Sequence, residues 1–151
     1  MVYALFLHSL VRWIIMLLAL AVLVQGISGM SSKKPFTSGA RKSMLFLMIS
    51  CDIQLLLGLV LFFVNGWGNV LAQGHAMDNK YNRFYTVEHS IGMLLAIVFI
   101  HIGYTATKKR IDDNVKYKRI FWFTLLALVI ILATVPWPGK EIVGRPMLRS
   151  L

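Results

Sequence analysis

Apolar residues form four long stretches, each bounded by charged or turn-forming residues, at positions 4–27, 43–64, 85–106 and 119–135. At about 1.5 Å of rise per residue, a helix over each stretch covers most or all of a hydrocarbon core roughly 30 Å thick. The fourth is the shortest and stops at Pro136 and Pro138, which cannot continue a helix. The pattern predicts an all-α membrane protein, with residues 1–151 forming one domain of four transmembrane helices.

The first stretch is interpreted as a retained helix. It has no basic segment in front, and His8 and Arg12 interrupt the region that would have to be apolar in a signal peptide. Alternating passes across the membrane then give an up-down-up-down four-helix bundle. The connection over residues 65–84 is long for such a bundle, and a short interfacial helix around residues 70–75 is one way to fill it.

Composition supports the membrane assignment, since 58% of the residues are hydrophobic. The net charge of +10 is concentrated in two loops. Segment 31–42 has four basic residues and no acid, segment 107–119 has six against two acids, and segment 65–84 has two against one. The positive-inside rule places the first two loops in the cytoplasm and both termini outside. The charge is therefore a topology signal, with the lipid bilayer as the partner and no nucleic acid.

Two histidines fall at matched positions in helices that cross the membrane in the same direction. His8 lies about five residues into the first stretch and His89 about five residues into the third. Imidazole is a common axial ligand of haem iron, and the first and third helices of an up-down bundle lie diagonally opposite each other. We therefore consider His8 and His89 as candidate axial ligands, with the iron as the metal.

The residues that share a face with these histidines are small, and two interpretations stay open. They leave room for a porphyrin, or they allow the helices to pack closely with nothing between them. The residues concerned are Ala19 and Gly26 beside His8, and Gly92, Ala96 and Gly103 beside His89.

Arg12 lies one turn deeper than His8 on the same helix face and must find an acceptor, because its guanidinium stays charged. A haem propionate is one candidate. An intramembrane ion pair with Asp52, near the middle of the second helix, is favoured, and such a pair is structural. Gln54 on the same helix is expected to hydrogen-bond a neighbouring helix.

Three further side chains are considered, two as structural or proton-active groups and one as an alternative ligand of the iron. Glu88 either reaches the outer interface, which is favoured, or relays protons to a quinone. His101 lies twelve residues after His89, about 18 Å along the axis and about 120° around it, which is poor geometry for a second haem on the same face. It is interpreted as a hydrogen-bonded packing residue or a proton-active group near the inner surface. Met93 offers a weaker His/Met alternative for the iron.

Several segments resemble a family of small four-helix bacterial membrane proteins labelled cytochrome b. The resemblance covers most of the chain in the same order and spacing. It is carried by His8-Ser9-Leu10-Val11-Arg12-Trp13, Gln54-Leu55-Leu56-Leu57-Gly58-Leu59, Thr86-Val87-Glu88-His89 and Pro136-Trp137-Pro138. It implies a b-type haem protein of the bacterial inner (cytoplasmic) membrane, with His8 and His89 matching the histidines of the family.

The chain departs from that family at Asp52 and Tyr104, near which some relatives carry histidines. These departures count against a full set of haem ligands and leave the pair His8 and His89 intact.

Two functions of different classes follow. The first is an electron-transfer protein that binds one haem b between the first and third helices and exchanges electrons with quinone or a partner subunit. The second is a haem-free accessory subunit of a larger inner-membrane complex, in which the polar residues fix helix packing or contact a protein partner or a second copy. A weaker third option is quinone or proton chemistry at Glu88 and His89. Whether the chain is an enzyme stays open.

Overall fold

The computed structural model describes residues 2–148 and shows an all-helical chain, with no strand in that range. Four helical segments are long and apolar enough to cross a membrane. They are α1 (Val2–Ser32), α2 (Ser38–Val64), the segment Lys80–Ala106 and α6 (Asp113–Thr134). The third segment consists of α4 (Lys80–Arg83), a π-helix η2 (Phe84–Glu88) and α5 (His89–Ala106).

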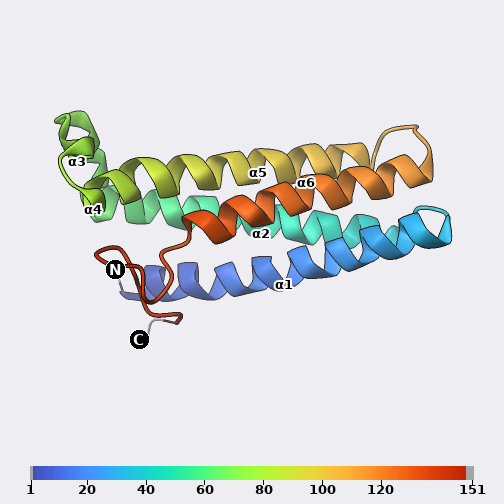
Figure 1. The fold of residues 1–151 in the computed structure, drawn as a ribbon, viewed down its shortest axis with the longest axis horizontal. Coiled ribbons are helices and arrows are strands. Elements are labelled where there is room, and N and C mark those ends of the chain that lie inside the picture. The colour runs from blue at the N-terminus through green and yellow to red at the C-terminus, as the bar shows by residue number, and fades with distance from the viewer. Residues whose placement is uncertain (1, 149–151) are drawn as a thin grey trace.

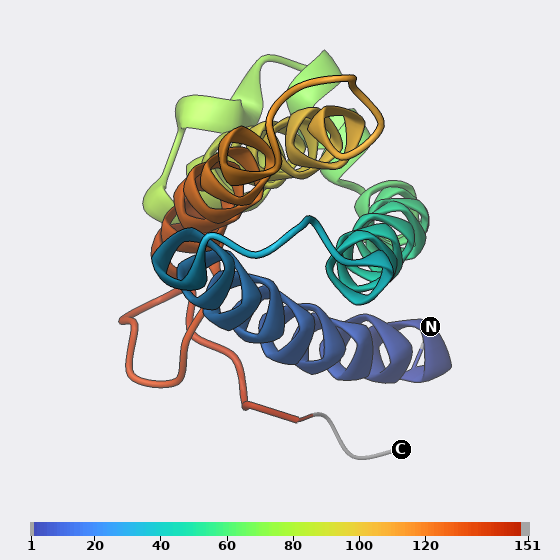
Figure 2. The same ribbon diagram turned by 90° about the vertical axis from the view of Figure 1, so that its right-hand side faces the viewer.

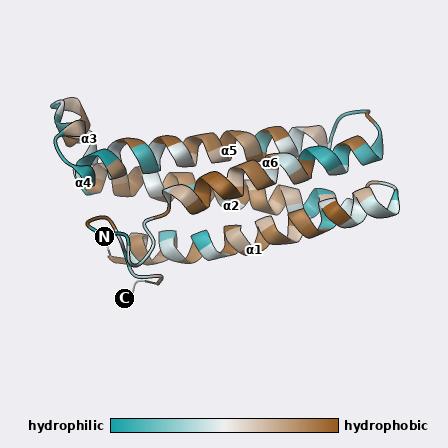
Figure 3. Ribbon diagram, viewed as in Figure 1, coloured by the Kyte–Doolittle hydropathy of each residue, from teal (hydrophilic) through white to brown (hydrophobic). Residues whose placement is uncertain are grey.

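The helices are longer than the apolar stretches that predict them. Helix α2 begins at Ser38, where the Thr37 side chain accepts a hydrogen bond of 3.1 Å from the Ala40 amide and so caps the helix. Helix α6 begins at Asp113, several residues ahead of the predicted start. The hydropathy pattern marks only the part of each helix that would lie in lipid, whereas the helices continue into polar flanks (Figure 3).

The four helices form a closed bundle in which each packs against two neighbours. Helix α1 packs against α2 and α6, and α5 packs against α6 and, less extensively, α2. Helices α1 and α5 are therefore diagonal, as predicted, and the end-on view shows this order (Figures 1 and 2). Both ends of the described chain lie at one end of the bundle, together with α3 and α4.

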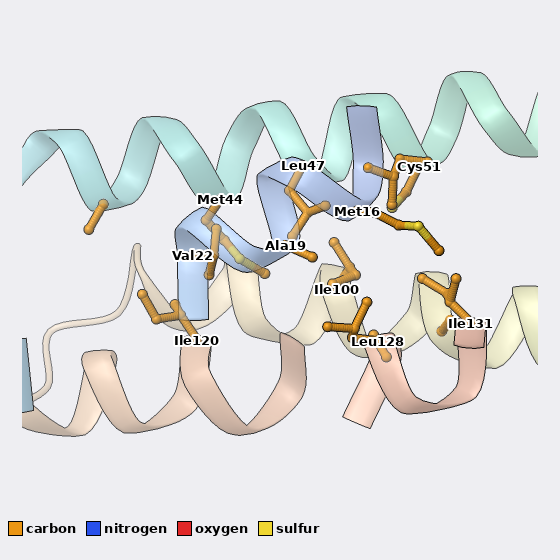
Figure 4. Packing of buried hydrophobic residues seen from close by; sticks show 14 of the residues in the cluster. Met16, Ala19, Val22, Met44, Leu47, Cys51, Ile100, Ile120, Leu128 and Ile131 are labelled. Atoms are coloured by element: carbon orange, nitrogen blue, oxygen red, sulfur yellow. The ribbon is translucent and has the colours of Figure 1, made fainter. Parts of the chain in front are cut away.

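The core lies in the middle of the bundle and draws on all four helices (Figure 4). Met16 and Val22 of α1 meet Leu47 of α2, Ile100 of α5 and Leu128 of α6 in one buried cluster. Large apolar side chains also cover the outside of the helices, as expected where lipid replaces water. The structure therefore supports a multi-pass membrane protein.

Neighbouring side chains fill the space beside the small residues on the inner helix faces. A Cβ atom on Gly92 would lie 2.6 Å from Thr134, one on Gly103 2.7 Å from Met44, and one on Gly26 2.9 Å from Phe121. Ala19 and Ala96 belong to the buried core. Of the two interpretations left open by the sequence, close helix packing is the one found here.

The long connection between α2 and α5 is folded. It contains α3 (Trp67–Ala72) and the 3₁₀ turn η1 (His75–Met77), so its helix begins three residues ahead of the predicted one. Gly66 and Gly74, with φ of 81° and 78°, make the turns before these two elements. Trp67 stacks on Tyr85 with ring centroids 5.2 Å apart, which holds α3 against the third span.

The chain after α6 folds back over the same end of the bundle. Lys140 donates hydrogen bonds to the carbonyls of Ala133 and Val135, at the end of α6. Further on, the Tyr85 hydroxyl donates to the Val143 carbonyl at 2.7 Å. Residues 136–148 therefore form a tail that lies against the bundle.

Candidate functional site

His8 and His89 face each other across the bundle near the end that carries the chain termini. Their ring centroids are 6.4 Å apart and the ring planes make an angle of 66°. The two side chains come from the diagonal helices α1 and α5, and both are partly buried. The matched depth predicted from the sequence is thus confirmed as a direct approach of the two rings.

The His89 ring is held from two sides. Its Nδ1 atom donates a hydrogen bond of 2.9 Å to the carbonyl of Thr134, at the end of α6. This bond places the proton on Nδ1 and leaves a lone pair on Nε2, the form that binds a metal. Phe84 packs beside the ring with its centroid 6.0 Å away.

The π-helix η2 comes directly before His89, the first residue of α5. The His89 amide donates to the carbonyl of Phe84, five residues earlier, and the Ser90 hydroxyl donates to the carbonyl of Tyr85. A π turn inserts one residue into the helical repeat and re-aims the side chains on either side of it. The sequence pattern alone does not reveal this feature.

His8 is held through its backbone. Gln54 of α2 donates a hydrogen bond of 2.9 Å to the His8 carbonyl, which confirms the expected helix-to-helix role of Gln54. Gly58, one turn further along α2, lies beside the ring, and a Cβ atom there would be 3.5 Å from His8 Cε1. The Nδ1 atom of His8 is buried and has no hydrogen-bond partner within residues 2–148.

The spacing of the two rings fits two imidazoles bound to one metal ion. With metal–nitrogen bonds of about 2 Å and a ring nitrogen about 1.1 Å from its centroid, two imidazoles on opposite sides of an iron have centroids about 6.2 Å apart. The observed 6.4 Å is close to this value. Room for the flat ring does not come from Gly92 or Gly103, which other side chains fill, whereas a Cβ atom at Gly58 would make only an ordinary contact with the His8 ring.

Arg12 does not pair with Asp52, so the favoured ion pair is wrong. Its guanidinium donates to the carbonyl of Met147 in the tail and to the hydroxyl of Ser9 at 3.3 Å. Ser9 and the Trp13 indole also donate to the Met147 carbonyl, at 3.1 Å and 3.2 Å. Arg12 therefore helps to hold the tail on α1.

Helix geometry explains why Asp52 is out of reach of Arg12. Gln54 faces α1, because it binds the His8 carbonyl. Two residues correspond to a rotation of about 200° around a helix, so Asp52 faces away from α1 and toward α5. There the His101 Nε2 atom donates a hydrogen bond of 2.8 Å to Asp52 Oδ1. His101 is a hydrogen-bonded residue, as expected, with a partner that the sequence did not indicate.

The remaining candidates take no part in the contact between the two facing histidines. Glu88 forms an exposed pair with Arg83 at 2.7 Å, consistent with the favoured interfacial role. Met93 packs against the hydrophobic core. Within residues 2–148 there is no group of three or more histidine, cysteine or acidic side chains placed to hold a metal ion.

A cavity of about 310 Å³ lies at the opposite end of the bundle, between α1, the turn that follows it and Tyr117 of α6. Its lining includes the side chains of Gln25, Ser28 and Lys34. This end carries the two basic loops and is separate from the two histidines.

No family model, curated protein or solved structure significantly matches the chain. The assignment of a function therefore rests on the geometry of the residues themselves.

Proposed function

We propose that the chain is a b-type cytochrome-like membrane protein that binds one haem through His8 and His89. The observation that carries this proposal is the facing pair of imidazoles, with centroids 6.4 Å apart, on two helices that do not otherwise pack closely. A haem in this position would supply one-electron oxidation and reduction within the bilayer. Quinone or a partner subunit is the proposed electron donor or acceptor.

Each proposed ligand is oriented by a group of its own. The Thr134 carbonyl fixes the tautomer and tilt of His89, and Gln54 fixes the position of the His8 backbone. Such outer contacts are typical of metal-binding histidines because they hold the ring in place and raise its basicity. His8 Nδ1 is one of several buried polar atoms without a hydrogen-bond partner within residues 2–148, and Arg12 Nε and Gln54 Oε1 are others.

The proposed topology follows from charge. The loops 33–37 and 107–112 and the helix ends that flank them carry most of the basic residues, so this end is assigned to the cytoplasm of a bacterial inner membrane. Both termini and the pair His8 and His89 then lie toward the outside. Haem and electron exchange would therefore be located in the outer half of the bilayer.

The deciding experiment is an absorption spectrum of the purified protein, oxidised and then reduced with dithionite, after expression with adequate haem. We expect a Soret band that shifts on reduction and is lost in His8→Ala and in His89→Ala. His101→Ala and His75→Ala are matched controls, because neither ring contacts the pair, and both should retain the band. Wild-type protein that folds but shows no Soret band would refute the proposal.

A second candidate function is that of a haem-free accessory subunit in a larger inner-membrane complex. The close packing at Gly26, Gly92 and Gly103 favours it, because the helices already fill the space that the sequence left open for a porphyrin. In that case His8 and His89 are part of a polar network that fixes helix packing. Co-purification with a stoichiometric protein partner, without pigment, would support this function over the first. Glu88, the residue considered for quinone or proton chemistry, forms an exposed pair with Arg83.

A further inference from the structure

The cavity at the basic end of the bundle lies along the end of α1. Its wall is one face of α1 between Val24 and Ser32, completed by Lys34 and Thr37 of the following turn and by Tyr117 of α6. Its volume of about 310 Å³ lies at the lower end of the range for small-molecule sites, which is roughly 300–1,000 Å³. The cavity is therefore large enough for a small polar group.

The turn after α1 places Lys34 at this cavity. Lys33 has a φ of 49°, the left-handed conformation in which many helices end. The buried Tyr117 then holds the turn, because its hydroxyl donates to the Pro35 carbonyl and accepts from the Thr37 amide. The position of Lys34 is therefore set by backbone contacts of its neighbours, which leave its side chain free.

The cavity offers hydrogen-bond donors and no acid. Within residues 2–148 the Lys34 side chain makes no hydrogen bond, ion pair or ring contact, and the Ser28 hydroxyl makes no hydrogen bond. The Thr37 hydroxyl accepts from a backbone amide and keeps its own proton available. The described lining contains no aspartate or glutamate, and Asp113 at the start of α6 is paired with Lys116 at 2.9 Å. These donors are complementary to a ligand with negatively charged oxygens, such as a phosphate group.

The cavity also spans the boundary between the apolar and the polar surface of α1. Val24 and Ile27 are 65% and 50% exposed, as expected for residues in contact with lipid, whereas Ser28 and Ser32 are exposed polar residues. Val24 and Ser32 are eight residues apart, or about 12 Å along the helix. One end of the cavity therefore lies at the level of the hydrocarbon and the other at the level of the headgroups.

We propose that this cavity binds the headgroup of an anionic phospholipid from the leaflet at the basic end of the bundle. The phosphate accepts hydrogen bonds from Lys34, Ser28 and Thr37, and the acyl chains continue along α1 past Val24. Basic pockets between membrane helices are known to hold anionic headgroups in this way. A free phosphate ion could use the same donors, but it would leave the apolar end of the cavity without a partner.

A lipid with a net negative charge suits the site better than a zwitterionic lipid. Segment 31–42 carries four basic residues and no acid, so the potential around the cavity is positive. A zwitterionic headgroup brings a positive charge of its own into this region and gains less from it. The site lies at the opposite end of the bundle from the two facing histidines, so the proposal does not depend on haem binding.

Native mass spectrometry of the purified protein in detergent measures this binding. The probes are phosphatidylglycerol and phosphatidylcholine with the same acyl chains, each titrated separately. We expect one phosphatidylglycerol to bind with a dissociation constant at least fivefold below that of phosphatidylcholine. Lys34→Gln should remove this preference. Lys33→Gln is the matched control, because it removes the same charge from the preceding residue, which does not line the cavity, and it should retain the preference.

A second pair of variants fills the cavity without changing its charge. Ser28→Phe places a ring in the cavity, whereas Ile27→Phe places one on the adjacent surface outside it. We expect Ser28→Phe to raise the dissociation constant of phosphatidylglycerol at least fivefold and Ile27→Phe to change it less than twofold. Both positions are exposed, so both variants should fold, and thermal unfolding without added lipid checks this. If Ser28→Phe does not fold, the comparison of the two lysine variants decides by itself.

Thermal unfolding with inorganic phosphate separates a lipid site from a site for the free anion. Phosphatidylglycerol should stabilise the wild type more than Lys34→Gln, because a ligand stabilises the folded state that binds it. Inorganic phosphate should stabilise both proteins equally, acting only as an excluded salt. The proposal is overturned by a phosphate effect that depends on Lys34, by equal binding of the two lipids to the wild type, or by equal weakening in Lys33→Gln and Lys34→Gln.

Discussion

Gln54 and Asp52 lie two residues apart on α2 and bind two different helices. Gln54 donates to the His8 carbonyl on α1, whereas Asp52 accepts from His101 on α5. The rotation of about 200° between them allows a single turn of α2 to fix its position against both neighbours. The contact made by Gln54 leads to the first prediction.

Replacing Gln54 by leucine removes the bond to the His8 backbone and should lower the free energy of unfolding by about 1 kcal/mol. Gln25→Leu is the matched control, because Gln25 donates a hydrogen bond of 3.0 Å to Ser43 at the other end of the same two helices. Thermal unfolding in detergent should show a similar loss for both. If haem binds, only Gln54→Leu should weaken its reconstitution, and equal weakening by Gln25→Leu would contradict the role given to Gln54.

Adding one methyl group at Gly92 should be far more harmful than adding one at Gly58. A Cβ atom at position 92 would be 2.6 Å from Thr134 Cγ2, whereas at position 58 the nearest atom is His8 Cε1 at 3.5 Å. We expect Gly92→Ala to cost about 1–3 kcal/mol through overpacking and Gly58→Ala to stay within about 0.5 kcal/mol. Chemical denaturation of both variants measures the difference, and equal stabilities would show that α5 and α6 are less closely packed than described.

Removing the Tyr117 hydroxyl should destabilise the turn between α1 and α2. This hydroxyl donates to the Pro35 carbonyl at 3.1 Å and accepts from the Thr37 amide at 3.2 Å, while the ring is buried against Gly29. Tyr117→Phe leaves two backbone groups without their partner, so a loss of about 1–2 kcal/mol is expected.

Tyr104→Phe is the control for this measurement. The Tyr104 ring contacts Lys108 through its face, an interaction that phenylalanine retains. Thermal unfolding should separate the two variants, and a Tyr117→Phe protein as stable as wild type would mean that the turn does not depend on this hydroxyl.

Arg12→Leu should release the tail from α1. The Met147 carbonyl loses its charged donor and keeps only Ser9 and Trp13. Loss of about 1 kcal/mol in local stability should raise the rate of trypsin cleavage after Lys140 roughly fivefold, provided that the tail opens and closes quickly. Mass spectrometry of a digestion time course gives the rate. Arg83→Gln, which breaks only an exposed pair with Glu88, should leave the cleavage unchanged.

Hydropathy and charge were sufficient to predict the four spans, their order in the bundle and the matched depth of His8 and His89. These features depend on length and helical period, which can be read from one sequence. The identity of a cofactor does not follow in the same way, because two facing imidazoles are a necessary part of a haem site and not the whole of it. Haem binding therefore stays a prediction.

The partners of Arg12 and Asp52 were beyond the reach of the sequence for a different reason. Arg12 binds a backbone carbonyl in the tail, and every residue carries such an acceptor, so no residue type marks Met147 as the partner. The choice between Arg12 and His101 for Asp52 depends on the rotation of α2, which only the contact from Gln54 reveals. The small residues were also ambiguous. Gly92 leaves room for the Thr134 side chain, so its small size does not indicate a ligand.

The π-helix at Phe84–Glu88 makes the outer part of the third span adjustable by chain length. Deleting one residue there would restore the ordinary α-helical repeat, because a π turn holds one residue more than an α turn. The helix on either side would keep its faces, so Tyr81 should stay against Trp67 and His89 against the Thr134 carbonyl. The third span can therefore gain or lose a residue at this point in evolution without moving the histidine that follows it.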